Sequence, residues 1–206
     1  MPGLRERKKQ QTRQAISDAA IALFLDAGYE QTSVAAIAEA AAVSRRTLFS
    51  YFPAKDDLVL HRIADHAGEA ARVVRNRPAR WSPLAALRAH HLAGLNRRDP
   101  ATGLCDDSEV LALYGLINEH PVLANGLLAF RRRDAAQLAD ALLDTGNTNA
   151  FRARMAAAQF TTTQHLLAED NVKHLVEGQS AAERHPGAVA DAETAFALLS
   201  DGLRKL

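Results

Sequence analysis

The apolar residues recur every three to four positions along most of the chain, a pattern that predicts helices rather than strands. In residues 12–27 they form one stripe made of Ile16, Ala19, Ala20, Leu23 and Phe24. Gly28 follows this stripe, where a helix C-cap is expected. A second stripe begins after Ser33, a suitable N-cap, and consists of Val34, Ile37, Ala38 and Ala41. The two patterns predict two amphipathic helices near the N-terminus.

A third, shorter helix is predicted directly after these two. Residues 42–44 break the pattern, and Leu48 and Phe52 then lie four positions apart, so that both can point inward. The helix is expected from about Arg45 to Phe52, and Pro53 ends it because proline cannot continue the hydrogen-bond ladder. The outward positions are Arg45, Arg46, Phe49 and Ser50. Two arginines on the exposed first turn of a short helix, braced by another helix, are typical of a recognition helix in a DNA major groove.

Positive charge is concentrated next to this predicted helix-turn-helix. The first thirteen residues hold five basic side chains and one acidic side chain. A basic arm leading into a helix suits DNA phosphates or a minor groove, because lysine and arginine displace condensed counterions. Lys55 stands after the recognition helix, where a phosphate would pass.

Residues 10–62 closely resemble the N-terminal DNA-binding domain of TetR-type transcriptional repressors. The residues that carry the match are Phe24, Gly28, Tyr29, Thr32-Ser33-Val34, Ile37-Ala38, the run from Val43 to Phe52, and Lys55. The resemblance implies an all-helical homodimer whose C-terminal domain binds a small molecule and thereby releases the DNA operator. One departure is Ala42, which stands where the family usually has a glycine. If this turn residue is left-handed, alanine there costs roughly 1 kcal/mol; otherwise the turn differs slightly.

The resemblance also assigns DNA contacts to individual residues. The residues expected to face bases are Arg45, Arg46, Thr47 and Phe49. Those expected to hold the phosphate backbone are Ser33, Ser50, Tyr51 and Lys55. Ser44, at the start of the recognition helix, completes the expected DNA-binding set.

The remaining sequence predicts further helices, giving an all-α fold of about nine. A long helix is expected from Asp56 through Val74, and His185-Pro186-Gly187 is expected to form a turn. The other helices are expected at about 83–96, 108–119, 121–144, from 149 to before 178, and 189–203. We predict a helix-turn-helix domain with its basic arm at residues 1–60, and a ligand-binding and dimerisation domain at 61–206.

Composition narrows the class of protein. The net charge of the 206 residues is only +1, so the positive charge needed for DNA must be local. A single cysteine excludes an intrachain disulfide framework and suits the cytoplasm, where we expect the protein. No apolar stretch is long enough for a membrane span. We expect no enzyme and no cofactor, because no Gly-rich phosphate loop, nucleophile elbow or HExxH motif occurs.

The sequence says least about the ligand. Adjacent His90 and His91 lack a Cys or acidic residue one turn away, so no metal site is expected. His91 and Tyr114 are the expected pocket residues, since both are polar-tipped on apolar faces, although plain core packing also explains them. The arginine-rich segments 75–80 and 131–133 would suit an anionic ligand.

Two functions and one structural question remain open at this point. The favoured function is a ligand-responsive repressor that binds a pseudo-palindromic operator as a homodimer and is released by a small molecule. The alternative is a DNA-binding protein of the same fold without an inducer, acting as a nucleoid or division factor. Small residues at Ala156, Ala157, Ala195 and Ala197 fit a close dimer interface, or simply reflect an alanine-rich chain.

Overall fold

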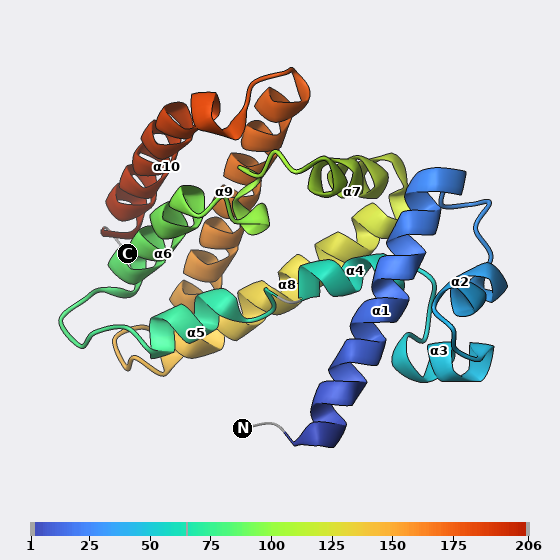
Figure 1. The fold of residues 1–206 in the computed structure, drawn as a ribbon. Coiled ribbons are helices and arrows are strands. Elements are labelled where there is room, and N and C mark those ends of the chain that lie inside the picture. The colour runs from blue at the N-terminus through green and yellow to red at the C-terminus, as the bar shows by residue number, and fades with distance from the viewer. Residues whose placement is uncertain (1–2, 65, 205–206) are drawn as a thin grey trace. The chain divides into compact units, whose positions relative to one another are not determined.

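A computed structural model describes residues 3–64 and 66–204, which are helical apart from short turns and loops (Figure 1). The helices of this described range are α1 (Leu4–Ala27), α2 (Val34–Ala40), α3 (Arg45–Tyr51), α4 (Asp57–Ala64), α5 (Glu69–Arg75), α6 (Pro83–Asn96), the 3₁₀ helix η1 (Pro100–Thr102), α7 (Ser108–Glu119), α8 (Pro121–Leu143), α9 (Ala150–Val176) and α10 (Ala181–Arg204). No strand occurs among the described residues. The prediction of an all-α fold is confirmed.

The chain divides into two compact units. Unit 1 comprises Met1–Asp65 and Ala112–Leu127, and unit 2 comprises His66–Leu111 and Leu128–Leu206. Both α7 and α8 therefore contribute residues to each unit. The stretch 112–127, which the sequence analysis grouped with the second domain, packs with the first.

The core of unit 1 is formed by the inward faces of α1 to α4 together with residues from α7 and α8. The predicted stripes provide it: Ile16, Ala20, Phe24, Ile37, Leu48 and Phe52 are all buried. Ser17 is one of the buried polar residues of unit 1, and its hydroxyl donates to the carbonyl of Leu58 over 2.7 Å. This bond fixes α1 against α4 and leaves no buried hydroxyl unsatisfied there.

Unit 2 packs α6, α9 and α10 side by side (Figure 1). Gly103, with a φ of 71°, lets the turn after η1 approach α9, since a Cβ there would lie 2.1 Å from the carbonyl oxygen of Ala168. Asn171 on α9 donates to the carbonyl of Thr102 over 2.9 Å and accepts from Arg184 on α10 over 3.0 Å. One buried polar chain thus joins η1, α9 and α10.

The long helix predicted after Asp56 is wrong, because α4 ends at Ala64 and α5 begins at Glu69. Gly68 between them has a φ of 67°, a left-handed conformation that a continuous α-helix cannot contain. Its N–H donates to the Asp134 carboxylate over 2.7 Å. The apolar residues keep their helical spacing across residues 65–68, so their pattern gives no sign of a break. Asp134, which holds the start of α5, lies far away in the sequence.

The turn predicted at His185-Pro186-Gly187 is also wrong, because α10 passes through Pro186. The helix begins earlier, at a capping box formed by Ser180 and Glu183. Arg184 binds Asp170 over 2.8 Å, and His185 meets the Asn96 side chain at 2.9 Å. These contacts hold the segment in helical form despite the proline, which removes one backbone donor.

Candidate DNA-binding surface

The recognition helix α3 is fixed at its N-terminal end by hydroxyl groups. Ser44 is its N-cap and accepts from the N–H of Thr47 over 3.0 Å. Ser33 caps α2 in the same way, accepting from the N–H of Ala36 over 3.1 Å. Both bonds satisfy amides that a helix start would otherwise leave unpaired. The turn between the two helices is closed by Val43, whose N–H donates to the carbonyl of Ala38 over 2.9 Å.

The outward face of α3 carries the side chains that the sequence placed there. Arg45, Arg46 and Ser50 are exposed, and Phe49 is 48 % exposed. Within the described part of the chain, neither Arg45 nor Arg46 makes a hydrogen bond or ion pair. Both guanidinium groups are therefore available to a ligand, and an arginine can pair bidentately with a guanine edge.

The hydroxyl groups on α3 and at the start of α2 already make hydrogen bonds within the helix-turn-helix. Ser50 donates to the carbonyl of Thr47 over 2.6 Å, so its proton must be redirected before it can donate to a phosphate. The oxygens of Ser44 and Thr47 lie 2.8 Å apart. The Ser33 hydroxyl accepts from its own helix start, which leaves its proton free to donate.

Lys55 is held inside unit 1 rather than extended toward solvent. Its ammonium group donates to the carbonyl of Tyr29, and it lies 4.3 Å from the centre of the Tyr29 ring and 5.5 Å from that of Phe24. Burial, together with the nearby carboxylates of Asp56 and Glu30, raises the pKa of Tyr29, which stays protonated. A half-buried lysine in this position stabilises the loop after α1, and a phosphate would have to compete for it.

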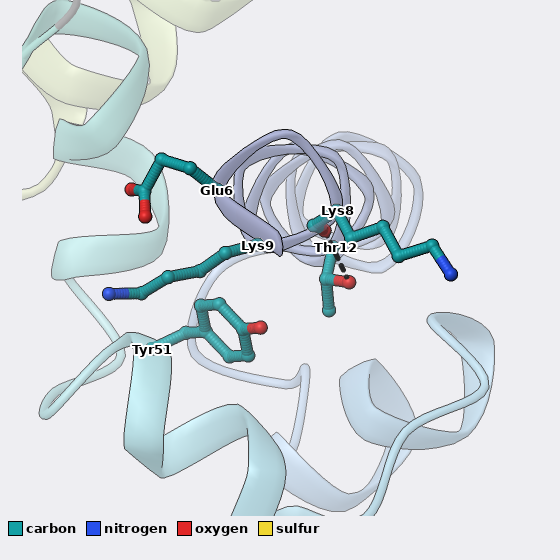
Figure 2. A pocket seen from close by; sticks show the side chains of 5 residues that line it. All are labelled: Glu6, Lys8, Lys9, Thr12 and Tyr51. Atoms are coloured by element: carbon teal, nitrogen blue, oxygen red, sulfur yellow. Dashed lines mark hydrogen bonds between the residues drawn. The ribbon is translucent and has the colours of Figure 1, made fainter. Parts of the chain in front are cut away.

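A groove between the first turns of α1 and the end of α3 brings Tyr51, a predicted phosphate contact, together with residues of the predicted basic arm. The α1–α3 groove has a volume of about 560 Å³ and is lined by Glu6, Lys8, Lys9, Thr12 and Tyr51. Figure 2 shows Lys9 extending beside Tyr51, with Lys8 reaching out on the other side of Thr12. Two ammonium groups and a phenol at the edge of the recognition helix suit a phosphate backbone.

The predicted basic arm needs a correction, because α1 begins at Leu4 rather than near Thr12. Residues 1–2 lie outside the described range, and the basic residues from position 5 onward belong to the helix. The sequence held a usable signal, since residues 4–11 lack glycine and proline and contain good helix formers. The lysines are thus carried on a rigid element next to Tyr51.

The two predicted pocket residues fall in different units. His91 lies in unit 2 and lines a small cavity there, whereas Tyr114 belongs to the segment 112–127 of unit 1 and does not line that cavity. No group of three or more metal-ligating side chains among residues 3–64 and 66–204 is arranged to hold a metal ion. None of the helices in that range is long and apolar enough to cross a membrane.

Comparisons with known proteins agree with this geometry. Residues 16–62 match the family model described as bacterial regulatory proteins, tetR family. The chain is 40 % identical over 131 residues to the HTH-type transcriptional regulator TcmR of Streptomyces glaucescens, covering 62 % of this chain and 55 % of that protein. The chain spans about half the length of the curated relatives it matches.

Solved structures extend the likeness to both units. GusR of Salmonella enterica is 25 % identical and superposes with a TM-score of 0.54, covering 95 % of this chain and 96 % of that one. NalD of Pseudomonas aeruginosa, the secondary repressor of the MexAB-OprM multidrug efflux pump, has a TM-score of 0.58 at 17 % identity, covering 90 % and 96 %. At that identity the likeness to NalD shows the fold alone.

Helix α3 is N-capped, contacts α2, and shares the core of unit 1 with α1 through Leu48. Its arginines have no partner among the described residues. This arrangement defines the class as a helix-turn-helix protein of the DNA-binding type. The family follows from the matched residues 16–62 and the relatives named above. Residues 16–62 form the DNA-binding domain of the TetR family of bacterial regulatory proteins.

Proposed function

We propose that this protein is a transcriptional regulator, a repressor that binds a pseudo-palindromic DNA operator as a homodimer and is released by a small molecule. The observation that carries the DNA-binding part is the face of α3, where Arg45, Arg46 and Phe49 are exposed and the two arginines lack partners within the described residues. Direct base readout needs such free guanidinium groups, and Phe49 can contact a thymine methyl. The α1–α3 groove would supply phosphate contacts beside them.

A homodimer is proposed because one recognition helix covers too few base pairs. Two-fold related helices reach successive major grooves only at a spacing of about 34–36 Å. Helix α9 offers a surface for a second copy, since exposed positions recur along it with steps of four and three residues. These positions are Met155, Gln159, Thr162, Leu166, Glu169, Lys173 and Val176. Leu166 is 59 % exposed and Val176 69 %, and on α10 Leu198 is 70 % exposed.

The alanines considered for that interface divide between two roles. Ala157 is completely buried in the core of unit 2, so it packs within its own chain. Ala197 is exposed and can meet a second copy. Ala156 and Ala195 are half-buried.

Release by a small molecule requires that the ligand bind one dimer arrangement better than the other, with a coupling of about 1–3 kcal/mol. The cavity at His91 is the proposed place for it. The second candidate, operator binding without any effector, is favoured by the small volume of this cavity, about 30 Å³. A compound that both stabilises the protein and weakens operator binding would support the first candidate.

The test begins with footprinting of the full chain on the DNA flanking its own gene, at about physiological salt. We expect a protected pseudo-palindrome. Arg46→Ala should weaken binding to it by roughly 5- to 150-fold for each half-site and relax the base preference at one position of each half-site, because a bidentate contact contributes about 1–3 kcal/mol.

The matched control is Arg133→Ala, which removes an exposed arginine from α8 in unit 2. It changes the net charge equally and should leave operator affinity unchanged. If Arg46→Ala behaves like Arg133→Ala, α3 does not read bases. If the wild-type protein shows only uniform, salt-sensitive binding to all DNA, sequence-specific regulation is excluded for the sites tested.

A further inference from the structure

A small polar cavity lies in unit 2 between α5, α6, η1 and α9. Its volume is about 30 Å³, room for roughly one or two water-sized groups. The residues that line it are Glu69, His90, His91, Gly94, Asp99, Ala101, Thr102 and Gln164. This lining contains two carboxylates, and it contains neither arginine nor lysine.

His91 is the most unusual member of this lining. It is 3 % exposed, and its Nε2 has no hydrogen-bond partner within the described residues. Burial, and secondly the charge on neighbouring His90, lower the pKa of His91 to about 4, so that the ring is neutral at neutral pH. A buried polar atom without a partner costs free energy, and a ligand group that bonds to it recovers that cost.

Gln164 on α9 also lines the cavity and makes no hydrogen bond within the described part of the chain. Two polar side chains on different helices thus line one cavity with unused bonding capacity. Gln164 is half-buried, so the buried Nε2 of His91 carries the argument: core packing alone does not require an unpaired atom there, because buried polar groups are normally satisfied.

The charged residues of the lining are acceptors held in place. One oxygen of Glu69 lies 3.0 Å from Nδ1 of His66, and the other lies 3.1 Å from Nε2 of His90. Asp99 accepts from the N–H of Ala101 over 3.0 Å. Such a lining favours groups that donate hydrogen bonds and repels anions.

We propose that this cavity binds the polar end of the effector and selects a hydrogen-bond donor, an ammonium or hydroxyl group, over a carboxylate or phosphate. The inference rests on the proposed ligand-responsive function. The remainder of a larger effector would need space beyond the cavity. The arginine-rich segments considered for an anionic ligand contribute no residue to the lining, and Arg75 is paired with Asp144 at 3.1 Å.

The experiment uses the full chain with isotopically labelled histidine, in the absence of DNA, and follows the His91 ring by NMR. The probes are methylammonium chloride, methanol and sodium formate, titrated at equal ionic strength to roughly 0.2 M, because ligands of a few atoms bind no tighter than about millimolar. We expect saturable shifts of the His91 signals with methylammonium and methanol, and none with formate.

The variants distinguish the cavity from the rest of the surface. Glu69→Gln keeps the side-chain shape and should weaken methylammonium binding by ~10-fold, since it removes a charge-assisted bond. Gln164→Leu is a second variant that leaves the Glu69 pairs intact and should weaken methanol binding. Glu193→Gln is the control, because that carboxylate pairs with Arg88 on the surface of the same unit; it should change neither titration.

Formate binding as strong as that of methylammonium would overturn the proposal, and so would the absence of a saturable His91 shift with every probe. Because no DNA is present, these outcomes are independent of operator binding. Failure of the footprinting experiment would remove the regulatory role without altering the NMR result.

Discussion

At the scale of single residues, Ala42 keeps the turn between α2 and α3 of the TetR-type pattern at the cost of backbone strain. It forms the turn between α2 and α3 with a φ of 52°, in the left-handed region that the sequence analysis gave as one of two possibilities. A Cβ makes this conformation unfavourable by about 1–2 kcal/mol. The TetR-type glycine would avoid that cost, and the tight turn tolerates alanine because the surrounding contacts hold it.

Ala42→Gly is expected to stabilise unit 1, since relief of the backbone strain exceeds the extra freedom that glycine gives the unfolded chain. We expect a net gain of roughly 0.5–1 kcal/mol in the free energy of unfolding. Urea unfolding of the variant and the wild type measures it. Ala35→Gly, on the exposed side of α2, is the control and should lose about 0.5–1 kcal/mol. Equal losses in the two variants would contradict the strain argument.

Buried His91 makes stability depend on pH in a definite direction. Its pKa is about 4 in the folded protein and 6.5 in the unfolded chain, so between these values the unfolded state binds more protons. Its contribution is fully present above about pH 6.5 and is lost as the pH falls toward 4. The loss amounts to about 3 kcal/mol, at 1.4 kcal/mol for each pKa unit.

His91→Phe should therefore flatten the decline in stability between pH 6.5 and 4, as measured by urea unfolding at several pH values. His165, whose pKa burial also lowers to about 4, acts in the same direction, so part of the decline should remain. An unchanged slope in His91→Phe would mean that the pKa of His91 is not lowered in the folded protein.

At the scale of elements, local signals place helices well and tertiary contacts move their ends. The predicted starts of α6 at Pro83, α7 at Ser108 and α8 at Pro121 are confirmed. The predicted start of the last helix is wrong by about eight residues, because α10 already begins at Ala181. The pattern Ser180-x-x-Glu183 is a capping-box signal in the sequence, and it outweighs the helix-breaking tendency of the proline and glycine that follow it.

Ser180→Ala should loosen the first turns of α10, because the hydroxyl both accepts from the Glu183 N–H at 3.2 Å and donates to its carboxylate at 2.7 Å. We expect faster amide hydrogen exchange in residues 181–188 and a loss of ~1 kcal/mol in stability. Ser200→Ala, at an exposed interior position of the same helix, is the control. Equal exchange in both variants would show that Arg184 and His185 alone hold this end.

At the scale of the whole molecule, the proposed dimer depends on apolar side chains that the single chain leaves exposed on α9 and α10. Leu166 is central to that stripe. A charge there would lose its hydration if a second copy covers it, and two-fold symmetry would introduce the change twice.

Leu166→Glu should raise the dimer dissociation constant at least about a hundredfold, measured by sedimentation equilibrium, and weaken operator binding in parallel. Leu128→Glu places the same charge at an exposed leucine on α8, 45 % exposed, and should leave the oligomeric state unchanged. A monomeric wild-type protein, or an unaltered Leu166→Glu dimer, would exclude this stripe as the interface.

The sequence by itself determined the all-α class, most helix positions and the recognition helix. These follow from local chemistry, namely apolar periodicity, hydroxyl N-caps and prolines, which acts within one or two turns of the chain. The exposure of Arg45, Arg46 and Phe49 was predictable for the same reason. Once Leu48 and Phe52 face the core, helical geometry directs these three side chains outward.

Only the tertiary structure decided the break at Gly68, the internal bond of Lys55 to Tyr29, the α1–α3 groove and the cavity at His91. Each depends on a partner distant in sequence: Asp134 for Gly68, Tyr29 for Lys55, Tyr51 for Lys9, and Glu69 with Gln164 for His91. A local pattern contains no information about such partners, since the free energy of these contacts exists only when the helices have packed.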